Sequence, residues 1–128
     1  HGLRVDCAQI PDLVPILAVA MAAAEGDSRI TGAARLRIKE SDRLSAMAAA
    51  LTAAGADAAE LPDGLAIRGG KPLHAAKIEG CNDHRIVMAM AIASALSDGE
   101  WTITDAEATA KSAPAFWQEF ERLGGRTR

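Results

Sequence analysis

The hydrophobic and polar positions of the chain follow two different periods. Apolar residues that recur every three to four positions predict a helix, and short alternating or apolar runs between turn residues predict a strand. On this basis we expect helices over residues 12–24, 41–54, 83–96 and 112–123. We expect strands over residues 3–5, 29–36, 57–61, 65–68, 76–79 and 100–105.

The segment 41–54 carries the clearest helical pattern, because Leu44, Met47 and Leu51 fall on one face at the 3.6-residue period. The clearest turn is the Pro-Asp-Gly sequence at 62–64. Its residue types favour a tight turn, which predicts a hairpin between the two strands that flank it.

The elements follow the order β-α-β-α-β-β and then β-α-β-α. This order predicts an α/β fold of repeated βαβαββ units, since strands that alternate with helices form layered sheets. Residues 1–70 would form one complete unit, and residues 71–128 a partial second unit that lacks its final two strands. The whole chain would then be a single partial domain.

Composition excludes several classes of function. The chain has 128 residues, 49% of them hydrophobic and 24% charged, which is typical of a compact globular domain. A net charge of −3 and an aromatic content of 3% argue against general nucleic-acid binding.

The apolar runs are too short to cross a bilayer, and we expect no signal peptide. Cys7 and Cys81 have no metal or redox spacing, so we expect free thiols in a reducing cytoplasm.

Charged residues gather at the starts of the predicted helices. Helix N-termini carry unpaired N–H groups and the positive end of the helix dipole, so they attract anions. Arginine and lysine there would bind phosphate or carboxylate, and neighbouring carboxylates could act as general acid or base. The candidate cations are Lys39, Arg43, Arg85 and Lys111, and the candidate acids and bases are Asp12 and Glu40.

Each candidate also has a structural explanation that needs no ligand. These explanations are an N-cap role for Asp12, a cap at a solvated helix start for Ser41 or Asp42, a capped and partly buried side chain for His84 beside Asp83, and an ordinary surface lysine for Lys111. The sequence has no zinc-ligand spacing, glycine-rich phosphate loop or nucleophile elbow, and we expect neither a metal nor a cofactor. The residues alone therefore lead to an anion-binding α/β domain with candidate acids.

Four segments together resemble one enzyme family. They are Ile-Pro-Asp at 10–12, Arg-Ile-Lys-Glu-Ser-Asp-Arg-Leu at 37–44, Asn-Asp-His-Arg at 82–85 and Ala-Lys-Ser at 110–112. In wording, order and spacing they resemble the C-terminal third of the 5-enolpyruvylshikimate-3-phosphate synthase family. The resemblance extends from Arg4 to Gly124.

The resemblance implies an activity and an architecture. The family transfers the enolpyruvyl group of phosphoenolpyruvate to the 5-hydroxyl of shikimate 3-phosphate and releases phosphate, a step of aromatic amino-acid biosynthesis. Its members have two globular domains, each made of three βαβαββ units. Their active site lies in the cleft between the domains, which close on the substrates.

The resemblance also implies residue roles. Asp12 would accept the proton of the shikimate hydroxyl, Lys39 would touch that hydroxyl, and Glu40 would exchange a proton with the phosphoenolpyruvate methylene. How Asp12 and Glu40 divide the acid and base work stays open. The substrate-binding set would be Arg43, Arg85 and Lys111, oriented by Asp83 and His84.

Parts of the family pattern are absent from the sequence. Arg35 and Leu36 stand where many members have asparagine, and the family's N-terminal lysine, glycine-bearing phosphoenolpyruvate loop and serine-rich shikimate-phosphate site are missing. We therefore expect a C-terminal fragment that is inactive alone, that pairs with the missing N-terminal part of the same enzyme, and that could self-associate. Two alternatives stay open: a relative of the UDP-N-acetylglucosamine enolpyruvyl transferase, and a non-catalytic anion-binding domain.

Overall fold

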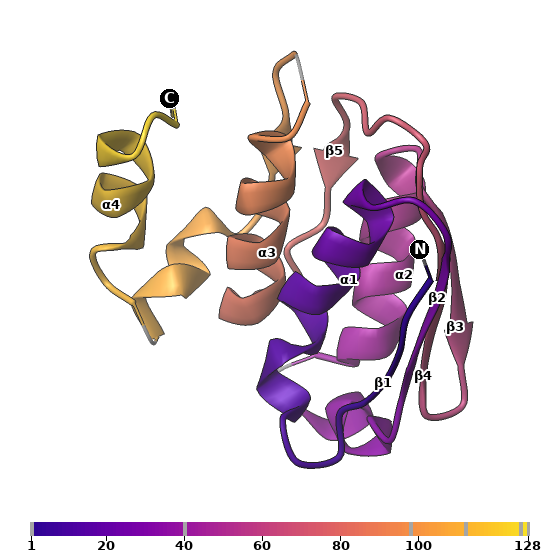
Figure 1. Ribbon diagram of the computed structural model, residues 1–128. Helices are drawn as coiled ribbons and strands as arrows, with labels where there is room; N and C mark the ends of the chain where they lie inside the picture. Colours follow the sequence, from indigo (N-terminus) through magenta and orange to yellow (C-terminus); the bar gives the residue numbers. More distant parts are fainter. Residues whose placement is uncertain (1, 40, 98, 112, 126, 128) are drawn as a thin grey trace.

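Strands and helices alternate through most of the chain in the computed structural model, which describes residues 2–39, 41–97, 99–111, 113–125 and 127 (Figure 1). The strands are β1 (Arg4–Asp6), β2 (Asp27–Thr31), β3 (Asp57–Leu61), β4 (Gly64–Arg68), β5 (Lys77–Ile78) and β6 (Thr102–Ile103). The α-helices are α1 (Val14–Ala23), α2 (Arg43–Ala53), α3 (His84–Ser94) and α4 (Phe116–Arg122). Three 3-10 helices are η1 (Pro11–Leu13), η2 (Ala34–Ile38) and η3 (Ala106–Lys111). The predicted α/β fold is confirmed.

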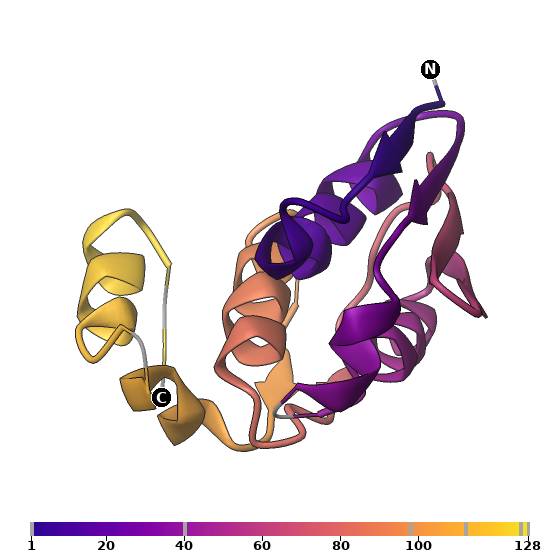
Figure 2. The same cartoon turned by 90° about the horizontal axis from the view of Figure 1, so that it is seen from below.

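The first half of the chain forms a four-stranded sheet in the order β1-β2-β4-β3. β1 and β2 are parallel and place Val5 opposite Ile30, whereas β4 is antiparallel to both β2 and β3. The predicted Pro-Asp-Gly turn joins β3 to β4, so the hairpin is confirmed. Helices α1 and α2 cover one face of this sheet (Figures 1 and 2).

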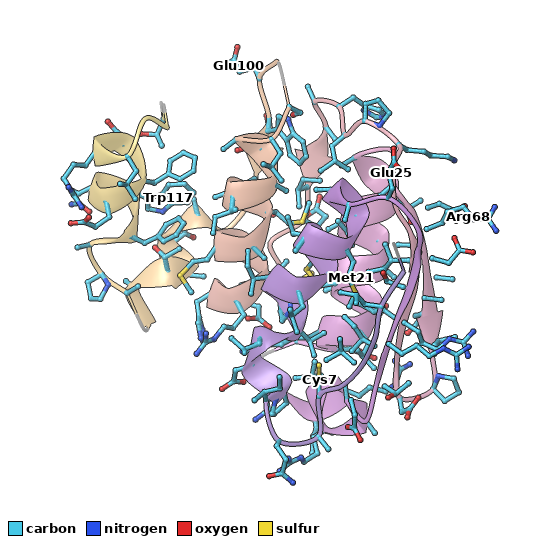
Figure 3. The ribbon with its side chains drawn as sticks, viewed as in Figure 1. Cys7, Met21, Glu25, Arg68, Glu100 and Trp117 are labelled. Atoms are coloured by element: carbon cyan, nitrogen blue, oxygen red, sulfur yellow. The ribbon has the colours of Figure 1, made fainter. Side chains whose placement is uncertain are left out.

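The hydrophobic core lies between this sheet and its two helices. Val14 of α1, Leu44 and Leu51 of α2, and Ile30 of β2 are all 0% exposed. Full burial of a side chain of this size contributes about 1.5–3 kcal/mol to stability. In Figure 3 the apolar side chain of Met21 lies inside the molecule, whereas the polar side chains of Arg68 and Glu100 point outward.

The second half of the chain repeats only the start of this arrangement. β5 and β6 form a two-stranded parallel sheet, which pairs Lys77 with Thr102 and Ile78 with Ile103. α3 connects the two strands and packs against α1 and α2. α4 stands apart beyond α3 (Figures 1 and 2), and Trp117 lies between α4 and the rest of the chain (Figure 3). The predicted order β-α-β-α is present here, while the division of the chain near residue 70 stays a prediction.

Two predicted boundaries are wrong. The strand expected over 29–36 ends at Thr31, because Gly32 has a left-handed φ of +72° that turns the chain, and η2 follows. The helix expected over 112–123 begins only at Phe116. Pro114 disfavours helical backbone at the residue before it, so the chain forms η3 first and restarts as α4.

None of the helices in the described parts of the chain has the length and apolar character that crossing a lipid bilayer requires.

Candidate anion-binding site

The first three α-helices begin at the same end of the molecule, the lower end in Figure 1. Asp42 caps α2 and accepts a hydrogen bond from the Ser45 amide (3.2 Å). Asp83 caps α3 and accepts one from the Arg85 amide (3.0 Å). Aspartate is a preferred N-cap, so these two residues fix where each helix begins and place Arg43 and Arg85 in the first turns.

Arg43 and Asp83 form a buried ion pair behind the site. Their side chains are 2% and 0% exposed, and Arg43 Nε lies 2.9 Å from Asp83 Oδ2. Ser41 Oγ donates a second hydrogen bond to the same oxygen (2.7 Å). Burial alone would raise the pKa of the Asp83 carboxyl, but the hydrogen bonds from Arg43, Ser41 and the Arg85 amide outweigh it, and the net pKa is lowered. Asp83 is therefore a carboxylate that joins the starts of α2 and α3.

Asp12 extends this network toward solvent. Its Oδ1 accepts a hydrogen bond from Arg43 Nη1 at 3.2 Å, and its Oδ2 lies 3.9 Å from Arg85 Nη2. The Asp12 side chain is 54% exposed. The N-cap explanation for Asp12 is wrong, because Leu13 occupies the N-cap position of α1 and no side chain caps that helix. η1 instead turns the carboxylate toward two guanidinium groups.

A pocket of about 140 Å³ opens where these residues meet. It is lined by Asp12, Lys39, Arg43, His84 and Arg85. Three of the five carry a positive charge and one carries a negative charge, while Asp83 lies buried behind Arg43. The walls therefore favour a small anion, and the volume suits a phosphate or carboxylate group.

Arg85 offers a donor to such an anion. Its side chain is 36% exposed, yet its Nε is buried and has no hydrogen-bond partner among the residues that the structure describes. A buried donor without a partner costs free energy, which a bound oxyanion would recover. Lys39, at the end of η2, adds an exposed ammonium group to the same pocket.

Two of the predicted site residues are not placed by the structure. Glu40 lies outside the described residues. Lys111 is the last residue of η3, and its side chain is likewise outside the description. Its predicted place at a helix start is wrong, since α4 begins five positions later at Phe116. Asp83 lies behind the pocket and not on its wall, and its predicted orienting role stays a prediction.

The role of Ser41 is not predicted by the sequence, which offers this residue only as a possible helix cap. In the structure Asp42 is the cap, and the Ser41 hydroxyl donates a hydrogen bond to Asp83, 42 positions away. Only the adjacent acidic and basic residues in the 39–43 cluster could have drawn attention to it.

Comparison with known proteins gives the family. Residues 1–120 match the family model described as "EPSP synthase (3-phosphoshikimate 1-carboxyvinyltransferase)". The chain belongs to the EPSP synthase family. Its sequence is 50% identical over 125 residues, 98% of the chain, to the 3-phosphoshikimate 1-carboxyvinyltransferase of Clostridium acetobutylicum. It is 48% identical over 126 residues, again 98% of the chain, to the one of Methanocella arvoryzae.

The fold agrees with solved structures of the EPSP synthase family. An EPSP synthase from Acinetobacter baumannii superposes on 86% of the chain with a TM-score of 0.80 and 42% sequence identity, and this covers 26% of that protein. The chain spans about 29% of the length of the Clostridium relative and 30% of the Methanocella relative.

Proposed function

We propose that this chain is part of an enzyme that transfers the enolpyruvyl group of phosphoenolpyruvate to the 5-hydroxyl of shikimate 3-phosphate and releases phosphate. The observation that carries the proposal is the 140 Å³ pocket in which Lys39, Arg43 and Arg85 surround Asp12. This arrangement suits a reaction in which one substrate is a small dianion or trianion and a hydroxyl must lose a proton.

The cations would bind phosphoenolpyruvate. Arg85, with its buried Nε and partly exposed guanidinium, would hold an oxyanion of this substrate, and Lys111 would contribute a second cation. Arg43 lines the pocket too, but its Nε and Nη1 already bond to Asp83 and Asp12. Arg43 would therefore add positive charge and also fix the position of the Asp12 carboxylate. Asp83 and His84 would orient this set.

The carboxylates would move the protons. Asp12 would take the proton of the 5-hydroxyl while the hydroxyl oxygen bonds to C2 of phosphoenolpyruvate. Lys39 would lie near that hydroxyl oxygen. Glu40, adjacent to Lys39, would supply a proton to the methylene carbon and take one back when the C–O bond to phosphate breaks. Cationic side chains would stabilise the departing phosphate, and carboxylates the oxocarbenium-like carbon.

Turnover by the full-length enzyme that contains this chain tests the proposal. We expect it to release phosphate from phosphoenolpyruvate with shikimate 3-phosphate as acceptor and not with UDP-N-acetylglucosamine. Turnover with the second acceptor alone would replace the proposed substrate. If the wild type binds phosphoenolpyruvate but turns over neither acceptor, the chain is a non-catalytic anion-binding domain.

We propose that the remaining part of the enzyme is the chain's physical partner. A hollow of about 1500 Å³ lies between α3, β6 and α4, and its apolar lining includes Ile92, Trp101, Ile103, Phe116, Trp117 and Phe120. Among the residues that the structure describes, β6 pairs only with β5, whereas its counterpart β2 also pairs with the hairpin strand β4. A hairpin from the rest of the enzyme would fill the hollow and continue the sheet. Analytical ultracentrifugation of the full-length enzyme and of the 128-residue chain tests this proposal. We expect the full-length enzyme to be a monomer and the chain alone to form a dimer, in which a second copy covers the surface that the missing part would occupy. A cytoplasmic location stays a prediction.

A further inference from the structure

The side chain of Arg37 makes four hydrogen bonds. Its Nε donates to the Pro62 carbonyl (3.1 Å) and its Nη2 to the Leu61 carbonyl (2.7 Å). Its Nη1 donates to Glu60 Oε2 (2.8 Å) and Asp42 Oδ2 (2.9 Å). The guanidinium group has five N–H donors, so these four bonds fix its plane and its position. The two carboxylates hold the pKa of Arg37 above its ordinary value, Glu60 more strongly.

These bonds tie the segment before α2 to the β3–β4 turn. The same turn also receives hydrogen bonds from Gly32, whose amide donates to Asp63 Oδ2 (3.1 Å), and from Ala33, whose amide donates to the Asp63 carbonyl (2.7 Å). The start of η2 and its last turn are thus both fixed to one hairpin. A hairpin joined to a four-stranded sheet is a rigid support for a short 3-10 helix.

Lys39 lies two positions after Arg37, whose side chain is joined to that of Asp42 across five positions. On the far side, Ser41 is fixed by its bond to buried Asp83. Lys39 is itself exposed, and its neighbour Ile38 is 83% exposed, so local packing does little to hold these two residues. The side-chain bonds of Arg37, directly before them, remain to fix their position.

We propose that Arg37 is a positioning residue that sets the place of Lys39 in the pocket. The inference rests on the proposed function, since Lys39 matters there through its contact with the reacting hydroxyl. Arg37 does not line the pocket, and its four hydrogen bonds go to Asp42 and the β3–β4 hairpin, so it acts on Lys39 through the backbone that joins the two residues. Lysine cannot replace it, because one ammonium group cannot reach two adjacent carbonyls and two carboxylates in a fixed plane.

A double-mutant cycle in the full-length enzyme tests the proposal. Arg37→Ala and Arg37→Lys should each lower kcat by about tenfold or more, since small misplacements of catalytic groups have effects of this size. In the Lys39→Ala background the same changes should lower kcat by a clearly smaller factor, because the part of the effect that acts through Lys39 is then absent. Arg68→Ala is the matched control. It removes an arginine that makes an exposed ion pair with Asp27, and it should leave kcat unchanged in both backgrounds.

Several outcomes separate this proposal from the proposed function. If the wild type shows no turnover with shikimate 3-phosphate, the proposed function fails. If the wild type is active and Arg37→Ala lowers kcat equally in both backgrounds, Arg37 does not act through Lys39 and the inference is overturned. Unchanged kcat in Arg37→Ala also overturns it. Should Arg37→Ala fail to fold, Glu60→Ala removes one anchor only and should show the same dependence on Lys39 with a smaller loss of kcat.

Discussion

Arg43 and Asp83 lie 40 positions apart in the sequence and form a buried ion pair 2.9 Å long at the starts of two neighbouring helices. The pair serves both the fold and the pocket, because Arg43 also holds Asp12, and the Asp83 backbone leads directly into His84 and Arg85. A change that breaks the pair should therefore affect stability first and binding second.

Asp83→Asn should destabilise the chain by about 3 kcal/mol or more, because it leaves Arg43 buried beside a neutral group. Asparagine is also a good N-cap, so the loss would report the charge and not the cap. The free energy of unfolding, measured in urea, checks this. Asp27→Asn is the control, since it breaks an exposed pair with Arg68 and should cost less than about 1 kcal/mol. Equal losses in the two variants would contradict the stabilising role of the buried pair.

The same carboxylate should make stability depend on acid pH. In the folded chain the pKa of Asp83 lies below its ordinary value of 3.8. The stabilisation from the ionised group is then fully present above the unfolded pKa, and it is lost as the pH falls through the lower folded pKa. The difference in unfolding free energy between wild type and Asp83→Asn should shrink on acidification from about pH 5 to about pH 2. A difference that stays constant over this range would exclude Asp83 as the titrating group.

The two catalytic candidates should affect turnover more than binding. Asp12→Asn or Glu40→Gln in the full-length enzyme should lower kcat by about 10²-fold or more, as expected for the loss of a general acid or base. Steady-state rates with both substrates saturating would measure this. Asp57→Asn removes an exposed carboxylate of β3 that does not line the pocket, and should leave kcat unchanged. Full activity of Glu40→Gln would favour the non-catalytic alternative.

Arg85 should discriminate between the two substrates. Arg85→Ala removes a pocket cation whose buried Nε has no hydrogen-bond partner among the described residues, and which under the proposed function binds an oxyanion of phosphoenolpyruvate. The KM for phosphoenolpyruvate should therefore rise more than the KM for shikimate 3-phosphate. Arg122→Ala, which removes an exposed arginine paired with Glu119 on α4, should change neither KM. An equal rise in both KM values would reject the assignment of Arg85 to one substrate.

The sequence predicts local features of this fold better than its long-range contacts. The Pro-Asp-Gly hairpin, the α2 periodicity and a cap at Ser41 or Asp42 depend on neighbours within a few positions. All three are confirmed, with Asp42 as the cap. The strand predicted over 29–36 is too long because apolar Leu36 extends the pattern. Leu36 is indeed buried, but it is a residue of the helix η2, which follows the turn at Gly32, and not of a strand.

The partners within the site could not be read from the sequence. Asp12 appeared as a possible N-cap because aspartate before a helix usually serves as one, and its actual partner Arg43 lies 31 positions away. The sequence does not predict the role of Arg37, because its four hydrogen-bond acceptors belong to residues 42 and 60–62 and no periodicity links these positions. In the sequence, only the shared position at predicted helix starts and the family resemblance connect the charged clusters to one another.

The 128-residue chain alone should be inactive and should bind shikimate 3-phosphate poorly. It spans about 29% of the Clostridium relative, and cleft enzymes of this kind need both sides of the cleft to place their reactants. The pocket still offers Lys39, Arg43 and Arg85, so inorganic phosphate or phosphoenolpyruvate should bind with a Kd on the order of 1 mM. Titration of each ligand into the isotope-labelled chain, followed by NMR at the Arg85 and Lys39 amides, would measure this. Salt should weaken the binding, because the contacts are ionic and partly exposed. Measurable turnover by these 128 residues would show that one side of the cleft suffices, and that the catalytic groups need no contribution from the rest of the enzyme.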